Sequence, residues 1–221
     1  MNRSSLMKYR GKISKELKDN LAASLRNDAV GIFPTDTIYG IVASAFSPQG
    51  VRRIYRLRKR NPRKPFIILI SSPRDLAKFG VRPLARQRRI MNAVWPGPTS
   101  LIFAISSGKF DYLTRGEGSL AFRVPKPVWL RDFLSASGPL VAPSANWEGK
   151  EPSRNVREAR KYFGDKVDFY VSRGNLISAP STLVSLVHEP KILREGASGL
   201  KGLTPTLMRE SSRRHRSRKF S

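Results

Sequence analysis

The chain has 221 residues and no cysteine, and its 42 lysines and arginines outnumber 16 acidic residues, for a net charge of +26. Without cysteine, disulfides, thiol catalysis and cysteine-bound zinc are excluded. Only His188 and His215 carry imidazole, in unrelated contexts, so neither a histidine metal site nor a Ser-His-Asp triad is expected. The positive charge favours a partner that carries phosphate, either a nucleotide or a nucleic acid.

A chain of this length suits one domain with a real hydrophobic core. We predict an N-terminal extension at 1–13, a catalytic domain at 14–202 and a basic, disordered tail at 203–221. Residues 208–221 carry a net charge of +5, and subtracting this from +26 leaves +21 for the rest, so the tail does not explain the charge. No apolar run approaches a membrane span and no signal peptide is visible, so we expect a cytoplasmic protein without a membrane partner.

The first half of the chain mixes helix and strand patterns. Leucines at every fourth position after Ser14, a capping residue, indicate the first helix. In chain order, the predicted elements are a helix over 14–27, a strand at 30–33, a polar loop at 34–40, a helix from Ser47 that ends before Pro62, a strand at 66–71, a short helix from Ser72 and a basic helix over 83–94.

The second half continues the mixture of strands and helices. Two strand pairs, within 100–124 and 182–194, have no helix between them, which favours a mixed sheet in an α/β or α+β fold. The predicted elements are strands at 100–106 and 119–124, a helix from Pro127 through Leu134, a strand running into a loop at 139–146, a helix near 156–163, and strands near 167–171, 182–187 and 191–194.

Polar side chains gather where predicted strands end, and sites of α/β proteins commonly lie there. The segment 34–40 (PTDTIYG) offers two threonine hydroxyls, a carboxylate and a phenol, and 143–146 (PSAN) offers a hydroxyl and an amide. Ordinary turns with a helix cap explain such residues about as well. Ser181 and Thr182 open a later strand in the same way.

The run from Arg52 to Lys64 holds eight basic residues in thirteen positions and no acid. A solvated helix face and a phosphate site are equally good interpretations of its charge. Arg58 and Arg60 cannot share a face of a regular helix, but in an unwound last turn they could converge on one anion. Arg123 and Arg194 close two strands, and their partners are either acids or a bound anion.

Seven fragments, in order, resemble the YrdC/Sua5/TsaC family over about residues 14–197. The fragments are FPTDTIYGI, the basic stretch that leads into PFIILI, WPGPTSLIF, LAFRVP, PLVAPSANWEGKEPS, APSTLVSL and KILREGA. One fragment alone is weak, but seven in this order identify the family. The resemblance implies an α/β fold in which a twisted open mixed sheet, flanked by helices, surrounds a positively charged cavity. It is similar to the short, single-domain form.

The resemblance also implies an activity. Family members are L-threonylcarbamoyladenylate synthases, nucleotidyltransferases that convert L-threonine, bicarbonate and ATP, with Mg²⁺, to threonylcarbamoyl-AMP and pyrophosphate. A downstream complex then transfers the threonylcarbamoyl group to adenosine 37 of tRNA. Some members bind double-stranded RNA, so a double-stranded RNA- or tRNA-binding protein without synthase activity is the main alternative. A carbamoyl-adenylate enzyme and a basic structural protein of a ribonucleoprotein are further alternatives.

Functional residues carry over from the family motifs position by position. The resemblance implies that Thr35 and Ser181 lie in the threonine pocket, and that Arg123 holds a carboxylate or phosphate. It assigns the catalytic set to Arg58, Arg60, Ser144 and Asn146, with no protein metal ligand. The ligand-binding set is Thr35, Arg123, Ser153, Ser181, Thr182 and Arg194.

Three positions depart from the family pattern. Arg58 stands in place of a lysine, Asn61 in place of a proline, and Glu148 in place of a serine. Arginine keeps the charge but changes reach and geometry. The resemblance does not assign the group that accepts the proton of the threonine amine. Asp36 is a candidate, and a loop cap explains it at least as well.

Overall fold

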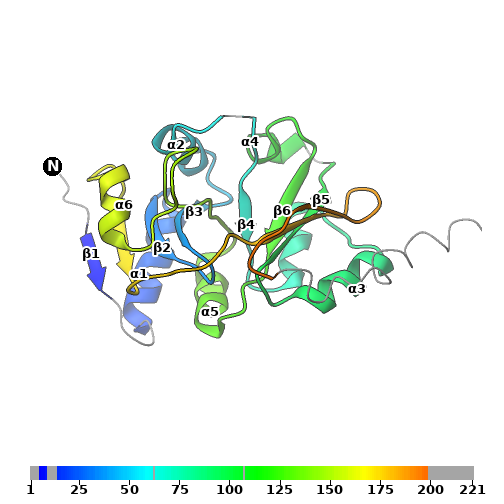
Figure 1. Ribbon diagram of the computed structural model, residues 1–221, viewed down its shortest axis with the longest axis horizontal. Helices are drawn as coiled ribbons and strands as arrows, with labels where there is room; N and C mark the ends of the chain where they lie inside the picture. The colour runs from blue at the N-terminus through cyan, green and yellow to red at the C-terminus, as the bar shows by residue number, and fades with distance from the viewer. Residues whose placement is uncertain (1–4, 9–13, 62, 107, 199–221) are drawn as a thin grey trace, which may run out of the picture.

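The computed structural model describes residues 5–8, 14–61, 63–106 and 108–198, so the tail predicted at 203–221 lies outside the described residues. Within the described part, ten strands form one sheet in the order β1-β8-β2-β3-β7-β4-β6-β5-β9-β10. Four of the pairings are parallel and five antiparallel. The predicted α/β fold with an open, twisted mixed sheet is confirmed (Figure 1). The strands are β1 (Ser5–Lys8), β2 (Gly31–Pro34), β3 (Tyr39–Ser44), β4 (Ile67–Leu69), β5 (Thr99–Ala104), β6 (Ser119–Arg123), β7 (Leu140–Val141), β8 (Phe169–Ser172), β9 (Thr182–Ser185) and β10 (Lys191–Arg194).

Helices of the described chain flank this sheet on both sides (Figure 1). Ser14 caps the first of them by accepting a 3.2 Å hydrogen bond from the Leu17 N–H, and Asn155 caps the last by accepting from the Glu158 N–H. The predicted helices at 14–27 and 156–163 are therefore confirmed, the first together with its predicted cap, Ser14. The helices are α1 (Lys15–Arg26), α2 (Pro48–Arg58), the 3₁₀ helix η1 (Pro73–Phe79), α3 (Ala85–Val94), the 3₁₀ helix η2 (Gly108–Phe110), α4 (Asp111–Thr114), α5 (Val128–Ser137) and α6 (Val156–Phe163).

Some predicted boundaries were wrong. Tyr39 and Gly40 belong to β3 rather than to a loop, because residues 31–34 and 39–42 pair as an antiparallel hairpin. The turn between them is therefore only four residues long. The predicted strand at 66–71 shortens to β4, whereas the strand predicted to run into a loop at 139–146 is the two-residue β7 followed by that loop. The short helix predicted after Ser72 is a 3₁₀ helix.

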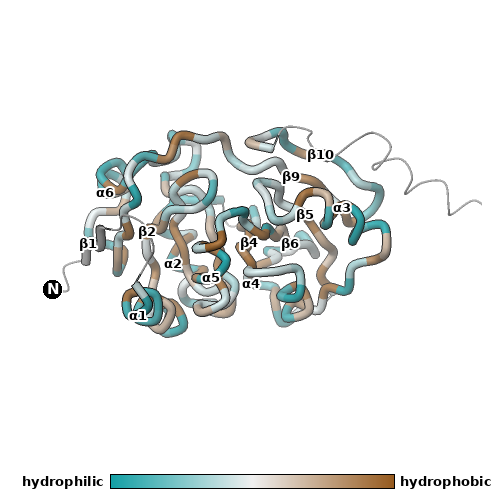
Figure 2. The backbone as a smooth tube through the Cα atoms, turned by 90° about the horizontal axis from the view of Figure 1, so that it is seen from below, coloured by the Kyte–Doolittle hydropathy of each residue, from teal (hydrophilic) through white to brown (hydrophobic). Residues whose placement is uncertain are grey.

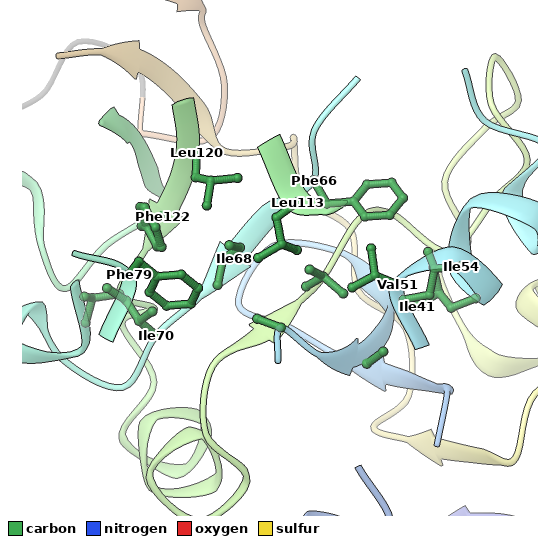
Figure 3. Packing of buried hydrophobic residues seen from close by; sticks show 14 of the residues in the cluster. Ile41, Val51, Ile54, Phe66, Ile68, Ile70, Phe79, Leu113, Leu120 and Phe122 are labelled. Carbon is green, nitrogen blue, oxygen red and sulfur yellow. The ribbon is translucent and has the colours of Figure 1, made fainter. Parts of the chain in front are cut away.

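Two clusters of buried apolar side chains lie on opposite faces of the sheet. Successive strand residues point to opposite faces, so Ile41 and Ile68 belong to one cluster and Val42 and Leu69 to the other. The larger cluster joins β4 and β6 to residues of α2, α4 and η1 (Figure 3). The smaller cluster packs against α1 and α5. Figure 2 shows hydrophobic segments along β4 and β5 inside the molecule and hydrophilic segments toward its outside.

The smaller cluster covers only part of its face of the sheet, and this arrangement positions the site. It draws its strand residues from β2, β3, β4, β7 and β8, and none from β5, β6 or β9 among the described residues. No described helix is both long and apolar enough to cross a membrane.

Candidate active site

A cavity of about 140 Å³ lies beside the smaller cluster. Gly40, Ile67 and Arg123 contribute to its wall and alternate along their strands with core residues of the larger cluster, so they point to the opposite face. The segment 173–181 crosses the width of the sheet between β8 and β9 (Figure 1), and its last residues cover part of the cavity. The lining residues are Thr35, Thr37, Ile38, Gly40, Arg58, Arg60, Pro65, Phe66, Ile67, Arg123, Ala142, Pro143, Ser144, Pro180, Ser181 and Arg194.

The tight turn between β2 and β3 places two threonine hydroxyls at the cavity. Thr35 Oγ1 donates a 2.6 Å hydrogen bond to the Ile38 carbonyl and accepts from the backbone N–H groups of Thr37 and Ile38. Its single proton is therefore used within the turn. Thr37 Oγ1 lies 3.3 Å from Thr35 Oγ1, and its side chain is buried at the cavity wall. Thr37 therefore has more hydrogen-bonding capacity left for a ligand than Thr35.

Arg58, at the end of α2, is buried with only 3% exposure. Its Nε donates to the Asn146 carbonyl at 3.1 Å, and its Nη2 donates to Ser144 Oγ at 3.1 Å and to Asn146 Oδ1 at 3.3 Å. Its Nη1 is buried with no hydrogen-bond partner among the described residues. Burial, followed by the nearby charge of Arg60, lowers the pKa of Arg58 to about 10. A buried cation held only by neutral oxygens is a site at which an anion is stabilised.

Arg60 follows the left-handed residue Lys59 that ends α2, and it reaches the same cavity. Its guanidinium lies over the Phe66 ring, 5.4 Å from the centroid, and 3.6 Å from Glu148 Oε1. Its hydrogen bonds to the carbonyls of Lys64 and Pro65 are long, at 3.4 and 3.5 Å. Arg60 is thus held loosely, in contrast to Arg58.

Arg123, at the end of β6, forms the other cationic wall. Its Nη2 lies 2.9 Å from Asp36 Oδ1, and the exposed fractions of the two side chains are 5% and 4%. This contact is within ion-pair distance but lacks hydrogen-bond geometry, since both Asp36 oxygens and Arg123 Nε have no hydrogen-bond partner among the described residues. Burial lowers the pKa of Arg123, and Asp36 opposes that effect. Asp36 is therefore the acid of a buried ion pair rather than a loop cap, and it does not line the cavity.

Ser181 and Arg194 complete the wall beneath the crossing segment. Ser181 is buried, and its Oγ lies 2.9 Å from Ser100 Oγ. Its carbonyl accepts hydrogen bonds from Arg194 Nε and Nη2 at 3.3 and 2.9 Å. Partial burial, then the charges of Arg123 and Arg60, lower the pKa of Arg194. Arg123 and Arg60 are thus close enough to Arg194 for their positive charges to disfavour its charged form.

Seven of the ten residues that the sequence suggests lie together on the cavity, and three lie behind it. Asn146 supports Arg58, Ser153 Oγ donates to the Ala145 carbonyl, and Thr182 Oγ1 accepts from the Gly196 N–H and from Ser198 Oγ. These three side chains are buried against protein and do not line the cavity, so their direct contact with a ligand stays a prediction. The seven that line the cavity are Thr35, Arg58, Arg60, Arg123, Ser144, Ser181 and Arg194.

Sequence reasoning missed the cavity role of Thr37 and the structural role of Glu148. Thr37 belongs to the quoted segment 34–40, so its hydroxyl was visible but was not chosen. Glu148 accepts a 2.7 Å hydrogen bond from the Asn61 backbone N–H and a 3.3 Å bond from Lys64 Nζ. Asn61 and Glu148, two departures from the family pattern, therefore contact each other.

Four basic side chains and four hydroxyls converge on this small volume, and no carboxylate lines it. The unsatisfied buried N–H groups of Arg58 and Arg123 point to ligands that carry anionic oxygens. The described residues contain no group of three or more histidine, cysteine, aspartate or glutamate side chains placed to hold a metal ion. The arrangement can bind and orient anions, but it presents no pair of groups suited to covalent nucleophilic catalysis.

Comparison with known proteins agrees with this geometry. A family model named for Sua5, YciO and YrdC and described as "Telomere recombination" matches residues 23–196. A protein of Halorhodospira halophila named threonylcarbamoyl-AMP synthase is 31% identical over 179 residues, which are 80% of this chain and 89% of that protein.

Solved structures share the fold. Sua5 of Pyrococcus abyssi, complexed with L-threonine, superposes with a TM-score of 0.82 at 27% identity, over 87% of this chain and 58% of that one. This chain thus spans little more than half of the Sua5 protein. YciO of Escherichia coli superposes with a TM-score of 0.81 at 21% identity, over 92% of this chain and all of that one. With a family match that covers most of its residues, this chain belongs to the Sua5/YciO/YrdC family.

Proposed function

We propose that this protein is an L-threonylcarbamoyladenylate synthase, which converts L-threonine, bicarbonate and ATP to threonylcarbamoyl-AMP and pyrophosphate. The names of its relatives support this activity, and the structure of a relative with L-threonine supports the amino acid as a ligand. The single observation that carries the proposal is the cavity itself, which is lined by two buried arginines, Arg58 and Arg123.

The two cationic walls fit two different ligands. Arg58 has no acid within ion-pair distance among the described residues, and Arg60 and Arg194 add two further cations, which suits a triphosphate. Arg123 is already paired with Asp36 and presents less net charge, which suits the carboxylate of an amino acid that also carries an ammonium group. Ser181 and Thr37 supply hydroxyls for the amino acid.

The chemistry needs positioning and charge neutralisation. The threonine amine and bicarbonate give a carbamate and water. A carbamate oxygen attacks the α-phosphorus of ATP, the bond to the bridging oxygen of the β-phosphate breaks, and pyrophosphate leaves with the electron pair. Arg58 and Arg60 would stabilise the charge that grows on the phosphates, and Arg123 would hold the carboxylate so that the carbamate faces the α-phosphate.

Mg²⁺ would enter this reaction with ATP. Because the described residues offer no cluster of three acidic or imidazole ligands, oxygens of the phosphates are its natural ligands here. In that position Mg²⁺ neutralises part of the phosphate charge. The residues of the chain then orient the phosphates rather than the metal.

The second candidate function is binding of double-stranded RNA or tRNA without synthesis. The net charge of +26 favours it, because Lys and Arg bind phosphate backbones without a cavity. The hydroxyls of Thr37 and Ser181, which are buried, and of Ser144, which is partly buried, favour the synthase, since a nucleic-acid surface has no use for groups inside a small cavity. In the synthase proposal, tRNA and a threonylcarbamoyl-transfer complex act after this protein.

Pyrophosphate release from ATP, bicarbonate and Mg²⁺ tests the proposal. We expect release that depends on L-threonine and that falls strongly in Arg60→Ala and Asn146→Ala, because the first removes a cavity cation and the second removes the support of Arg58. L-serine and the absence of amino acid are the comparisons. If the folded wild type shows no threonine-dependent release, the synthase proposal is wrong, and RNA binding becomes the leading function.

A further inference from the structure

Glu148 joins two segments that form neighbouring walls of the cavity. Its carboxylate accepts a 2.7 Å hydrogen bond from the Asn61 N–H through Oε2, and its Oε1 lies 3.3 Å from Lys64 Nζ and 3.6 Å from Arg60 Nη1. Its own backbone N–H donates to the Arg58 carbonyl at 2.9 Å. Glu148 thus contacts Arg60 itself, Arg58 before it, and Asn61 and Lys64 after it.

These contacts fall in the loop that joins α2 to β4, where Tyr55 Oη also donates a 2.8 Å hydrogen bond to the Lys64 carbonyl. α2 ends at Arg58, Lys59 is left-handed, and regular structure resumes only at β4. The Arg60 side chain makes only long hydrogen bonds, to two carbonyls of its own loop, while its backbone N–H donates to the Tyr55 carbonyl at 3.2 Å. In the described chain, Glu148 is the one acid within ion-pair distance of Arg60 or Lys64.

The shortest of these contacts goes to the backbone rather than to a cation. The Asn61 N–H bond of 2.7 Å fixes the peptide that follows Arg60, and charge-assisted hydrogen bonds of this kind are among the stronger ones. The ion pair with Arg60 is longer, at 3.6 Å, and the Glu148 side chain is 28% exposed, so that pair is expected to contribute less. The carboxylate acts mainly as an anchor for the loop.

We propose that Glu148 is a positioning residue that holds Arg60, Asn61 and Lys64 in place and thereby sets Arg60 for the triphosphate of ATP. This inference rests on the proposed function for the identity of the ligand. The opposite possibility is that Glu148 is a competing anion that occupies Arg60. The two possibilities predict opposite changes in ATP affinity when the carboxylate is removed.

Two variants of Glu148 and one control separate these possibilities. Glu148→Ala removes both the anchor and the charge, whereas Glu148→Gln removes the charge and keeps an oxygen that can accept from the Asn61 N–H. Glu151→Ala is the matched control, because it removes the same charge three residues away at an exposed position that does not line the cavity. Amide hydrogen exchange of residues 59–65 reports on the loop without any ligand.

We expect Glu148→Ala to weaken ATP binding by about tenfold, the loss of one charge-assisted hydrogen bond, when the dissociation constant is measured by calorimetry with Mg²⁺. Glu148→Gln is expected to stay within about threefold of the wild type, and Glu151→Ala to match it. Exchange at 59–65 rises in Glu148→Ala and much less in Glu148→Gln. The KM for ATP rises and the KM for L-threonine does not.

Tighter ATP binding in Glu148→Ala would overturn the proposal in favour of a competing anion. Unchanged exchange at 59–65, or a loss of thermal stability with unchanged ATP affinity, would overturn it as well. A wild type that does not bind ATP would also contradict it. If the wild type binds ATP but releases no pyrophosphate with threonine, the synthase proposal fails, while exchange and ATP affinity still decide the role of Glu148.

Discussion

Arg58 and Arg123 face the same cavity and are equally buried, yet their charges are stabilised in opposite ways. Arg58 donates three hydrogen bonds to neutral oxygens and has no acid within ion-pair distance in the described chain. Arg123 has an acid at 2.9 Å, but its buried Nε has no hydrogen-bond partner among the described residues. The first wall carries an uncompensated charge, and the second is nearly neutral. This difference suggests how one small cavity distinguishes a polyanion from an amino acid.

The largest expected loss of activity follows from removal of Arg58, the buried arginine that has no acid within ion-pair distance in the described chain. Arg58→Ala removes the cation and leaves Ser144 and Asn146 without their partner, so we expect kcat/KM for ATP to fall by about 10²–10³-fold, comparable to the loss of one preorganised donor in an active site. Steady-state pyrophosphate release measures this. Arg56→Ala, an exposed neighbour on the same helix, should stay near wild type, and an equal loss there would mean that charge alone matters.

Asp36→Asn should show that the buried charge of Arg123 depends on its acid partner. The change leaves the buried Arg123 charge unpaired, so the free energy of unfolding is expected to fall by about 3 kcal/mol and the KM for L-threonine to rise. Urea unfolding measures the first quantity. Glu189→Gln, which breaks the exposed pair with Arg86, should cost less than about 1 kcal/mol. Equal losses in the free energy of unfolding for the two variants would contradict the interpretation that Asp36 compensates the buried charge of Arg123.

Ser181→Ala tests whether the Ser181 hydroxyl contacts the amino acid proposed to bind beside Arg123. Loss of one buried hydroxyl should raise the KM for L-threonine by about five- to tenfold and leave the KM for ATP nearly unchanged. Ser100→Ala removes the same serine–serine contact from the side that does not line the cavity. If Ser100→Ala raises the threonine KM as much, the hydroxyl of Ser181 acts through packing and not through the ligand.

The smallest expected effect is on stability: the contribution of Glu148 to the free energy of unfolding should depend on pH. The Asn61 N–H lowers the pKa of Glu148 below its ordinary value; burial opposes this effect, and Lys64 and Arg60 add to it. A carboxyl with a lowered pKa stabilises the fold above its unfolded pKa of about 4.3 and loses that contribution as the pH falls through its folded pKa. Wild type should therefore be more stable than Glu148→Gln at pH 7, by less than about 1 kcal/mol.

Urea unfolding at pH 7 and pH 3 measures this difference, which should shrink at pH 3. A difference that persists at pH 3 would mean that the Glu148 charge is not its origin.

Local signals in the sequence predicted much of the fold. Ser14 was expected to cap a helix whose leucines recur every four residues, and α1 begins directly after it. The helix predicted near 156–163 is α6, with the same ends. β3 was missed because its small, uniformly buried residues follow a polar turn directly, with no alternation to mark a strand. The short pairing of β7 depends on neighbours distant in the chain and leaves no local pattern.

For the candidate site, too, the sequence predicted one part and left another unpredicted. Arg58, Ser144 and Ser181 lie in motifs, and the chain brings them to one cavity. The contacts that distinguish its two walls were not predictable, because they join residues far apart in sequence. Asn61 and Glu148 are 87 positions apart, and the pairing of Asp36 with Arg123 requires a hairpin turn and the end of a different strand to meet. Residue types suggested chemistry, but only the fold decided the partners.

Separate calorimetric titrations of ATP and L-threonine into wild type, Arg58→Gln and Arg123→Gln test the two-wall account most directly. The account predicts a crossed pattern. Arg58→Gln loses at least about tenfold in ATP affinity and keeps threonine binding, whereas Arg123→Gln loses threonine binding and keeps most ATP affinity. Parallel losses of both ligands in both folded variants, or a loss of ATP alone in each, would contradict it.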